Sequence, residues 1–370
     1  MGSWAKIGIL IASGTLIAVL LSEWGLRLID PSTFQKTTFP MFDWVVFDPV
    51  MSWQNKAGFD SENVTIRGKE FQANIHVNSQ GFRGDEVADK KPDGVLRIVC
   101  LGDSSTFGIT RLYGFTREPQ SIEASFDSYP GELAKLLIQE GYRNIEVINA
   151  GVIGYHSSQG LRQLITQVLD LQPNIVTARF GINDHARAWN PALLTEEPES
   201  TVQRRLLYVF SEWRLLRLLM GVYQSIQPLH LEANSVEWVD PDRFQRNLRR
   251  MVEISHENDF KLMLIDYPLR PLALETNLGE DLKNTLMGRA ATLEKLHQRH
   301  NEYQTLQAST ARALGTPLLK TKKALHESDV ATFSAYDPIH PTKAGAVIIA
   351  ELMLHQFQEL DWIPPRPDEK

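Results

Sequence analysis

The sequence contains little cysteine and no excess of positive charge. One cysteine, Cys100, occurs among 370 residues, which excludes a disulfide within the chain and a thiolate metal site. The formal net charge of −7 argues against a nucleic-acid surface, because phosphate binding requires a concentrated basic footprint. No run of like charges is long enough to form an interaction tail. We expect no nucleic-acid partner and predict neither a metal nor a cofactor.

The composition is otherwise that of a globular protein. Hydrophobic residues make up 43% of the chain and charged residues 22%, and the length allows one large domain or two smaller ones. Cys100 lies within the apolar run Leu96–Leu101, so we expect its thiol to be buried in a strand.

A long apolar segment occupies the N-terminus. From Trp4 to Trp24 the only charged residue before Glu23 is Lys6. About twenty residues at a rise of about 1.5 Å span about 30 Å, the thickness of a bilayer core. The two tryptophans would then lie at the two interfaces, where such residues are enriched. We interpret this segment as a single-pass transmembrane anchor.

Two alternatives remain for the same segment. It could be a cleaved signal peptide, although no small-residue cleavage site follows it, or a helix buried in the protein core. Lys6 and the terminal amine favour an orientation with the N-terminus inside, and Arg27 weakens this preference. We therefore expect the rest of the chain to be extracytoplasmic, either periplasmic or extracellular.

After the apolar segment, the chain divides into a small β-rich region and a larger domain. Segments 64–67 and 71–77 alternate in the manner of half-exposed strands. The polar run Lys90–Gly94 contains both proline and glycine and marks a boundary. We predict an anchor over 1–30, a β-rich collar over 31–94, a main domain over 95–360 and a C-terminal tail over 361–370.

Strands and helices alternate in the main domain. We expect strands over 96–101, 145–148, 174–180, 261–266 and 317–319. We expect helices from Tyr129 to Gly141, over 161–169, from Asp240 onwards, over 281–314 and over 342–359. This alternation predicts a parallel sheet with helices on both faces, and ligands bind such sheets beyond the carboxyl ends of the strands.

Four short motifs occur where a predicted strand gives way to a loop or helix. They are Gly102-Asp103-Ser104, Gly154, Gly181-Ile182-Asn183-Asp184 and Asp337-Pro338-Ile339-His340. A serine hydroxyl is a weak nucleophile until a base takes its proton. His340 is the candidate base for Ser104. Asp337, three residues earlier on the same predicted turn, can hold the Nδ1 side of its imidazole, and Pro338 and Pro341 stiffen that turn. These residue types predict acyl transfer through a serine.

The same motifs supply candidate donors for an oxyanion. The loop 149–155 can present backbone N–H groups, and its glycines, Gly151 and Gly154, permit close approach. Asn183, just past the third predicted strand, offers a side-chain amide. Such donors stabilise the negative charge of a tetrahedral intermediate.

In these four blocks the chain resembles the SGNH hydrolase superfamily, the GDSL-type esterases. The nucleophile block Gly102–Gly108 has serine at position 105 where the family usually has leucine, and the resemblance covers about 95–358. It implies a flavodoxin-like three-layer α/β/α fold and ester hydrolysis by Ser104, His340 and Asp337. It also implies an oxyanion hole formed by the N–H groups of Ser104 and Gly154 and the amide of Asn183.

Other polar residues have weaker claims to chemistry. We expect Asp103 and Asp184 to tie their loops to backbone N–H groups rather than to take part in the chemistry. His156 and His185 either line a substrate cleft or are ordinary loop histidines.

Two further regions carry alternatives of their own. His297 and His300 lie on a predicted helix rich in polar residues, where a solvated face is favoured over a metal site. The apolar segment 206–223 either packs over the cleft or touches a membrane.

The leading hypothesis is a membrane-anchored serine esterase or deacylase that acts on acyl esters of carbohydrate or lipid, in the cell envelope or on exported polysaccharide. One alternative is an O-acyltransferase, in which a sugar hydroxyl replaces water and the same triad serves. The other is a non-catalytic, anchored glycan-binding or assembly factor that retained the fold.

Overall fold

The computed structural model describes residues 3–28, 38–39, 42–48, 51–66, 69–112, 122–124, 128–186, 213–215, 239–271, 293–334 and 337–366. The chain forms two compact units. The smaller unit comprises Met1–Phe39, Val45–Gln54 and Pro198–His230, and the larger comprises Pro40–Trp44, Asn55–Glu197 and Leu231–Lys370. The domain boundaries at 30, 94 and 360 stay predictions.

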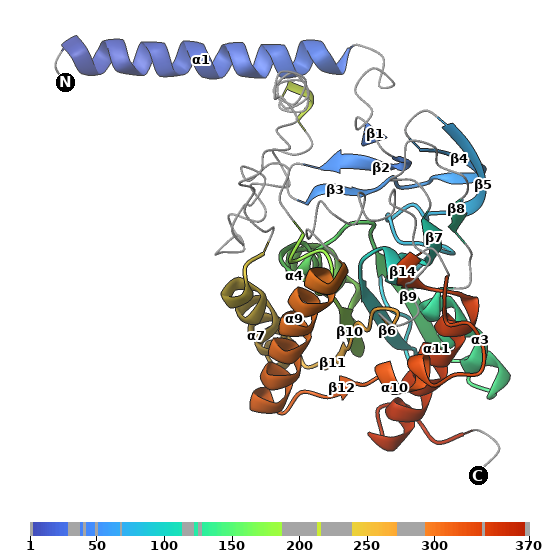
Figure 1. Cartoon of the computed structure of the whole chain (residues 1–370). Coiled ribbons are helices and arrows are strands. Elements are labelled where there is room, and N and C mark those ends of the chain that lie inside the picture. Colours follow the sequence, from blue (N-terminus) through green and yellow to red (C-terminus); the bar gives the residue numbers. More distant parts are fainter. Residues whose placement is uncertain are drawn as a thin grey trace. The chain divides into compact units, whose positions relative to one another are not determined.

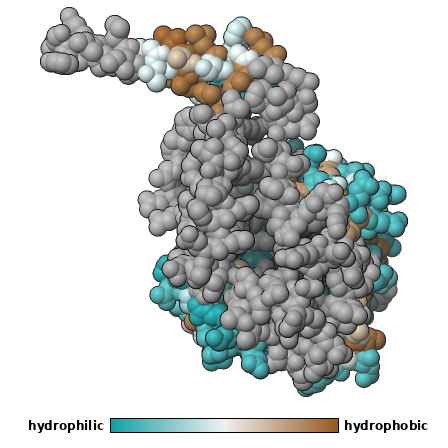
Figure 2. All heavy atoms as spheres, turned by 45° about the horizontal axis from the view of Figure 1, so that its top comes forward, coloured by the Kyte–Doolittle hydropathy of each residue, from teal (hydrophilic) through white to brown (hydrophobic). Residues whose placement is uncertain are grey.

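The smaller unit contains the predicted N-terminal helix, α1 (Ser3–Arg27). Several of its described side chains are exposed, with Leu21 62% and Trp24 63% accessible, and Figure 2 shows brown, hydrophobic residues along this helix. Among the residues that the structure describes, no helix is both long and apolar enough to span a membrane. The side chains of residues 3–12 lie outside the described part, and the anchor stays a prediction.

One acidic side chain of α1 is buried within the smaller unit. Glu23 is only 6% exposed, and its carboxylate accepts hydrogen bonds from Arg27 Nε at 2.8 Å and from Leu215 N at 2.9 Å. Arg214 donates to the carbonyl oxygen of Leu26 at 2.9 Å. A segment distant in sequence therefore provides hydrogen-bond partners for the C-terminal end of α1.

The predicted collar is an antiparallel sheet of order β1-β2-β4-β5, with β3 beside β2. Its strands are β1 (Thr38–Phe39), β2 (Phe42–Asp48), β3 (Ser52–Asn55), β4 (Asp60–Ile66) and β5 (Lys69–His76). The predicted strands 64–67 and 71–77 correspond to β4 and β5, which pair from Asp60↔His76 to Ile66↔Lys69. Strand β4 begins earlier than its alternating pattern indicated.

A five-stranded parallel sheet forms the centre of the larger unit, as predicted. Its strand order is β12-β11-β10-β6-β9 (Figure 1). The strands are β6 (Leu96–Gly102), β9 (Ile145–Gly151), β10 (Ile175–Arg179), β11 (Lys261–Ile265) and β12 (Leu318–Leu319). Helices cover both faces of this sheet, so Cys100 on β6 is fully buried, and burial raises the pKa of its thiol to about 12.

The helices lie in two layers (Figure 1). One face carries α3 (Tyr129–Gln139) and α11 (Lys343–Glu359). The other carries α4 (Ser157–Gln163), which continues as a π-helical turn (Leu164–Val168) and a 3₁₀ turn (Leu169–Leu171), with α7 (Pro241–Glu257) and α9 (Leu293–Leu314). The order α, β, α is the predicted three-layer fold.

Capping residues explain where several of these helices begin. The side chains of Ser128, Asp240 and Thr342 accept backbone N–H groups in the first turns of α3, α7 and α11. The described part of the predicted helix 281–314 begins at Leu293, and its earlier residues lie outside the described part.

The remaining elements of the larger unit are short. They are α2 (Ser104–Phe107), β7 (Ile109–Leu112), β8 (Ile122–Ala124), α10 (Lys322–His326), β13 (Phe333–Ser334) and β14 (Asp337–Pro341). Strands β7 and β8 pair with each other, and so do β13 and β14. The sequence predicted a turn at Asp337–His340, and the structure places these residues in β14, paired through Ser334↔Asp337.

Candidate active site

Ser104 lies directly beyond the carboxyl end of β6, a strand of the central sheet. Asp103 follows the strand in an extended conformation and caps the short helix α2, of which Ser104 is the first residue. The neighbouring strand β9 approaches this helix closely, because a Cβ atom on Gly151 would lie 2.2 Å from the backbone nitrogen of Phe107. Only glycine at position 151 leaves space for the turn that carries the serine.

The structure brings Ser104, His340 and Asp337 together in one hydrogen-bonded chain. The Ser104 hydroxyl is 2.7 Å from His340 Nε2, and His340 Nδ1 is 2.6 Å from Asp337 Oδ2. With the proton on Nδ1, His340 donates to the carboxylate and accepts from the serine, which is the arrangement that a general base requires. The three residues are buried, between 6% and 7% exposed.

The carboxylate of Asp337 is stabilised in its charged form. Burial by itself would raise the pKa of Asp337, but the charge and hydrogen bond of His340 oppose this, and the net shift is downward. Its other oxygen accepts the backbone N–H groups of Ile339 at 2.9 Å and His340 at 3.1 Å. Asp337 is thus suited to stay ionised and to stabilise an imidazolium beside it.

Two backbone N–H groups of the predicted oxyanion hole are open. In the part of the chain that the structure describes, neither the N–H of Ser104 nor that of Gly154 has a hydrogen-bond acceptor. Gly154 has a φ of +76°, a conformation that favours glycine. These open donors are the type of group that binds an oxyanion.

The third predicted donor, the amide of Asn183, has both of its protons hydrogen-bonded within the protein. Asn183 Nδ2 donates to Asp103 Oδ2 at 3.1 Å and to the carbonyl oxygen of Tyr155 at 3.0 Å. The motif residue Asp103 therefore fixes the amide of another motif, in addition to accepting the N–H of Ser105 at 2.9 Å as predicted. Burial raises the pKa of Asp103, although Ser105, Arg179 and His340 oppose the shift.

Comparison with known proteins identifies the family. Residues 100–348 match the model of the GDSL-like lipase/acylhydrolase family, and this stretch includes all four motifs. The chain belongs to this family. Membership implies ester hydrolase activity in general.

Solved structures similar to this GDSL-like family member include three hydrolases, each with a TM-score of 0.44. A lipase/acylhydrolase from Enterococcus faecalis is 17% identical, with 72% of this chain and 97% of that chain covered. The inhibitor-bound aryl esterase of M. smegmatis is 15% identical, with 72% and 100% covered. A variant of an acetyl-xylooligosaccharide esterase from Geobacillus is 18% identical, with 75% and 100% covered. No curated protein matches the chain.

The sequence analysis missed one tyrosine in this GDSL-like protein, Tyr267, which contacts both chain neighbours of the nucleophile, Asp103 and Ser105. The hydroxyl of Tyr267 lies 2.5 Å from Ser105 Oγ and donates to Asp103 Oδ1 at 3.2 Å. The guanidinium of Arg179 stacks over the Tyr267 ring at 4.2 Å from its centroid, and both side chains are fully buried. A signal existed, because Tyr267 follows the fourth predicted strand at the carboxyl edge where the other motifs were sought.

The two histidines beside the oxyanion motifs are buried rather than exposed to a cleft. His156 is 2% and His185 1% exposed. Burial, with the charges of Arg162 and Arg243, holds the pKa of His156 well below its usual range. Asp184 accepts the N–H of Ser157 at 2.9 Å, as predicted for a loop residue, and burial raises its pKa to about 7 despite the bonds from Ser157.

His300 corrects the prediction of a solvated helix face. It is 2% exposed, donates from Nε2 to the carbonyl oxygen of Tyr267 at 2.5 Å, and its Nδ1 lies 3.1 Å from His185 Nε2. The helix α9 is polar in sequence, but it packs on the sheet through hydrogen-bonding side chains as well as apolar ones. His297 is partly exposed.

Two further predictions, on a metal site and on the segment 206–223, concern regions that the structure describes only in part. Among the described residues, no group of three or more His, Cys, Asp or Glu side chains is placed to hold a metal ion. The apolar segment 206–223 lies outside the described residues except for 213–215.

Proposed function

We propose that this protein is a serine esterase or deacylase in which Ser104 is the nucleophile, His340 the general base and Asp337 the residue that orients the base. The observation that carries the proposal is the hydrogen-bonded chain of 2.7 Å and 2.6 Å that links these three side chains. The open N–H groups of Ser104 and Gly154 support it, since they provide donors for the developing oxyanion.

The proposed reaction has two half-reactions. Ser104 Oγ attacks the ester carbonyl carbon while His340 Nε2 takes the hydroxyl proton, and the negative charge on the carbonyl oxygen is received by the oxyanion donors. The alcohol leaves with the proton from His340, and the acyl group remains on the serine. Water then loses a proton to His340 and attacks the acyl-serine, and His340 returns that proton to Ser104 Oγ as the acid is released.

The Ser104→Ala variant tests this proposal. We expect hydrolysis of a chromogenic acetyl ester to fall by about 10³-fold or more, because nucleophilic catalysis is lost. A fluorophosphonate probe should label the unmodified protein and not the variant. Ser309→Ala changes an exposed serine on α9 and is the matched control, with full activity and labelling expected. Unchanged turnover in Ser104→Ala would overturn the proposal, and failure of the probe to label Ser104 would favour a non-catalytic glycan-binding role.

We further propose that the acyl group is carried by a carbohydrate or a lipid of the cell envelope or of an exported polysaccharide. A transferase would use the same residues, with a sugar hydroxyl in place of water in the second half-reaction. Product analysis with and without added oligosaccharide separates the two: free acid alone supports the hydrolase, and acylated saccharide supports the transferase. An acyl-chain-length series of chromogenic esters would define the acyl group.

Finally, we propose that α1 anchors the chain in a membrane, with the catalytic unit on the extracytoplasmic side. The length of α1 and its exposed apolar side chains support this. The chain should remain in the membrane fraction after washing at alkaline pH, and deletion of residues 1–28 should release it. A reporter that is active only outside the cytoplasm, fused to the C-terminus, should be active. Release of the full chain by the wash would refute anchoring, and an inactive reporter would refute the orientation.

A further inference from the structure

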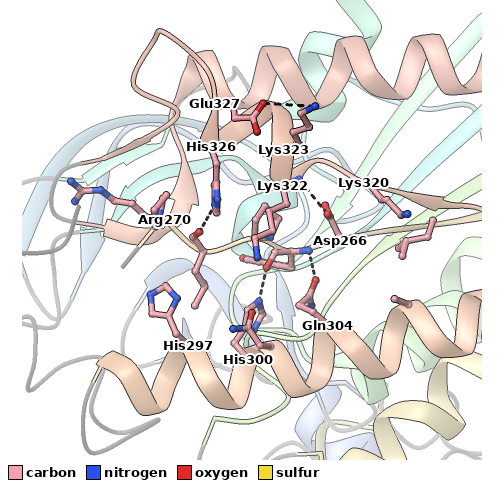
Figure 3. Close-up of a pocket in the computed structure, with 17 residues that line it drawn as sticks. Asp266, Arg270, His297, His300, Gln304, Lys320, Lys322, Lys323, His326 and Glu327 are labelled. Carbon is pink, nitrogen blue, oxygen red and sulfur yellow. Dashed lines mark hydrogen bonds and ion pairs between the residues drawn. The ribbon is translucent and has the colours of Figure 1, made fainter. Parts of the chain in front are cut away.

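A second hollow in the larger unit lies beside the proposed catalytic site. It has a volume of about 670 Å³ and is bounded by α9, by α10 and by the loop that follows β11. Figure 3 shows His297 and His300 on α9 at one side, and Lys322, Lys323 and His326 on α10 at the other. The proposed reaction uses none of these side chains.

The lining of this hollow carries more positive than negative charge. Its permanent cations are Arg270, Lys320, Lys322 and Lys323, and its carboxylates are Asp266 and Glu327. This excess is unexpected on a chain whose formal net charge is −7. The imidazoles of His297 and His326 add further hydrogen-bonding groups to the same surface.

The two carboxylates neutralise these cations only in part. Asp266 Oδ1 accepts from the N–H and the hydroxyl of Thr321 at 2.8 and 2.5 Å, and Oδ2 accepts from the N–H of Lys322 at 3.2 Å. These bonds place the carboxylate at the start of α10, and it keeps its negative charge, so Asp266 and Glu327 leave an excess of two positive charges among the described lining residues. Glu327 lies 3.9 Å from Lys323, and both side chains are largely exposed, so their attraction is weak. Within the described residues, the ammonium of Lys320 has no partner.

One backbone hydrogen bond connects a wall of the hollow to β14, the strand that carries Asp337 and His340. The N–H of Arg270 donates to the carbonyl oxygen of Pro338, within the strand that carries Asp337 and His340, at 2.8 Å. The preceding residue, Leu269, accepts from His326 at 2.8 Å. Leu269 also belongs to a buried apolar cluster with Ile339. A group bound in the hollow would therefore lie one loop away from the catalytic base.

We propose that this hollow binds an anionic group, a carboxylate or a phosphate monoester, carried by the acyl-ester substrate. A guanidinium and several ammonium groups line this cavity, and such groups are the donors that recognise oxyanions. The preferred substrates are then acyl esters of acidic molecules, such as uronic-acid saccharides. This substrate preference rests on the proposed esterase function, whereas anion binding itself does not.

Binding is tested first, in a protein that cannot turn over substrate. Inorganic phosphate and glucuronate are titrated calorimetrically into the full-length Ser104→Ala chain, with and without the added pair Lys320→Gln and Lys322→Gln. We expect Lys320→Gln with Lys322→Gln to lower the affinity for each anion by roughly tenfold, which is the effect of one lost charge-assisted hydrogen bond. The control pair is Lys90→Gln with Lys261→Gln, two exposed lysines outside the hollow, and it should leave binding unchanged. The proposed anion site is refuted if neither anion binds, or if the Lys320→Gln/Lys322→Gln variant and the control variant bind the anions equally well.

Substrate preference is tested second, with an acetylated methyl glucuronide and the corresponding acetylated methyl glucoside. These esters differ only in the carboxylate. We expect kcat/KM to favour the glucuronide by roughly tenfold in the unmodified chain, and the ratio to approach one in the Lys320→Gln/Lys322→Gln variant. Anion binding without any preference would show that the hollow takes a free anion and would refute the substrate assignment. If the unmodified chain hydrolyses neither ester, the proposed esterase function is refuted, and the anion-binding result is unaffected.

Discussion

Replacing Asp103 by asparagine should disable the site by displacing the amide of Asn183. The buried carboxylate of Asp103 accepts the N–H of Ser105 at 2.9 Å and the hydroxyl of Tyr267 at 3.2 Å on one oxygen. Its other oxygen accepts Asn183 Nδ2 at 3.1 Å. All three neighbours are donors in this arrangement, and a carboxylate can accept from all of them.

An asparagine at position 103 has only one acceptor oxygen. The N–H of Ser105 can only donate, so that oxygen must stay beside it, and the new NH₂ group then faces the NH₂ group of Asn183. Two donors about 3.1 Å apart repel, and Asn183 has to move. A substrate oxygen would have to take the Asn183 proton that the Tyr155 carbonyl oxygen accepts in the structure; losing that oxyanion donor lowers kcat by about 10²–10³-fold, or about 3–4 kcal/mol. Stability should change less, because the substitution also removes a buried carboxylate whose ionisation burial disfavours.

The assay is hydrolysis of an aryl acetate by Asp103→Asn, Asn183→Ala and the double variant. If Asp103 acts through Asn183, the double variant should be no slower than the slower single variant. Asp170→Asn changes an exposed aspartate and should retain full kcat. The reasoning is refuted if Asp103→Asn keeps more than a tenth of the activity, or if the two losses multiply.

Three further predictions follow from other contacts. Asp337→Asn should lower kcat by about 10⁴-fold with little change in melting temperature, because it places an NH₂ group against His340 Nδ1 and disfavours the required tautomer; a loss below tenfold in steady-state assays would contradict this. Gly151→Ala should lower the melting temperature by several degrees, because its methyl group would overlap the backbone of Phe107; calorimetry showing no change would contradict the close approach. The pKa of Asp184, raised to about 7, means that the folded state holds this proton more tightly than the unfolded state. The free energy of unfolding should therefore decrease between about pH 4 and pH 7, and Asp184→Asn should reduce that slope in urea titrations; an unchanged slope would contradict the shift.

Much of the fold followed from local patterns. The unbroken apolar run Leu96–Leu101 predicted a strand covered on both faces, and it forms the buried strand β6. Asp240 before Pro241, and Thr342 before the last helix, marked helix starts that the structure confirms as capped ends. Helix starts and buried strands can be predicted from the sequence because capping and hydrophobic periodicity depend on residues only a few positions apart.

Local patterns were less reliable where long-range packing decides the environment. The Asp337–His340 motif has the prolines of a turn, but pairing with Ser334 makes it a strand. His300 lies in a polar stretch of sequence, yet contacts with Tyr267 and His185 bury it. Polar side chains can be buried whenever distant groups satisfy their hydrogen bonds, and sequence periodicity does not show those partners.

The sequence by itself determined the types of residue available for chemistry, their order along the chain, and the strand ends at which most of them lie. Only the tertiary structure decided that Ser104 and His340, 236 positions apart, lie within a hydrogen bond, and that Tyr267 stands beneath the nucleophile. The same is true of the cationic hollow, whose walls come from α9, α10 and the loop after β11. The reason is physical: propensity and periodicity act over a few residues, whereas these distances depend on how the parallel strands and the helices covering them pack in space.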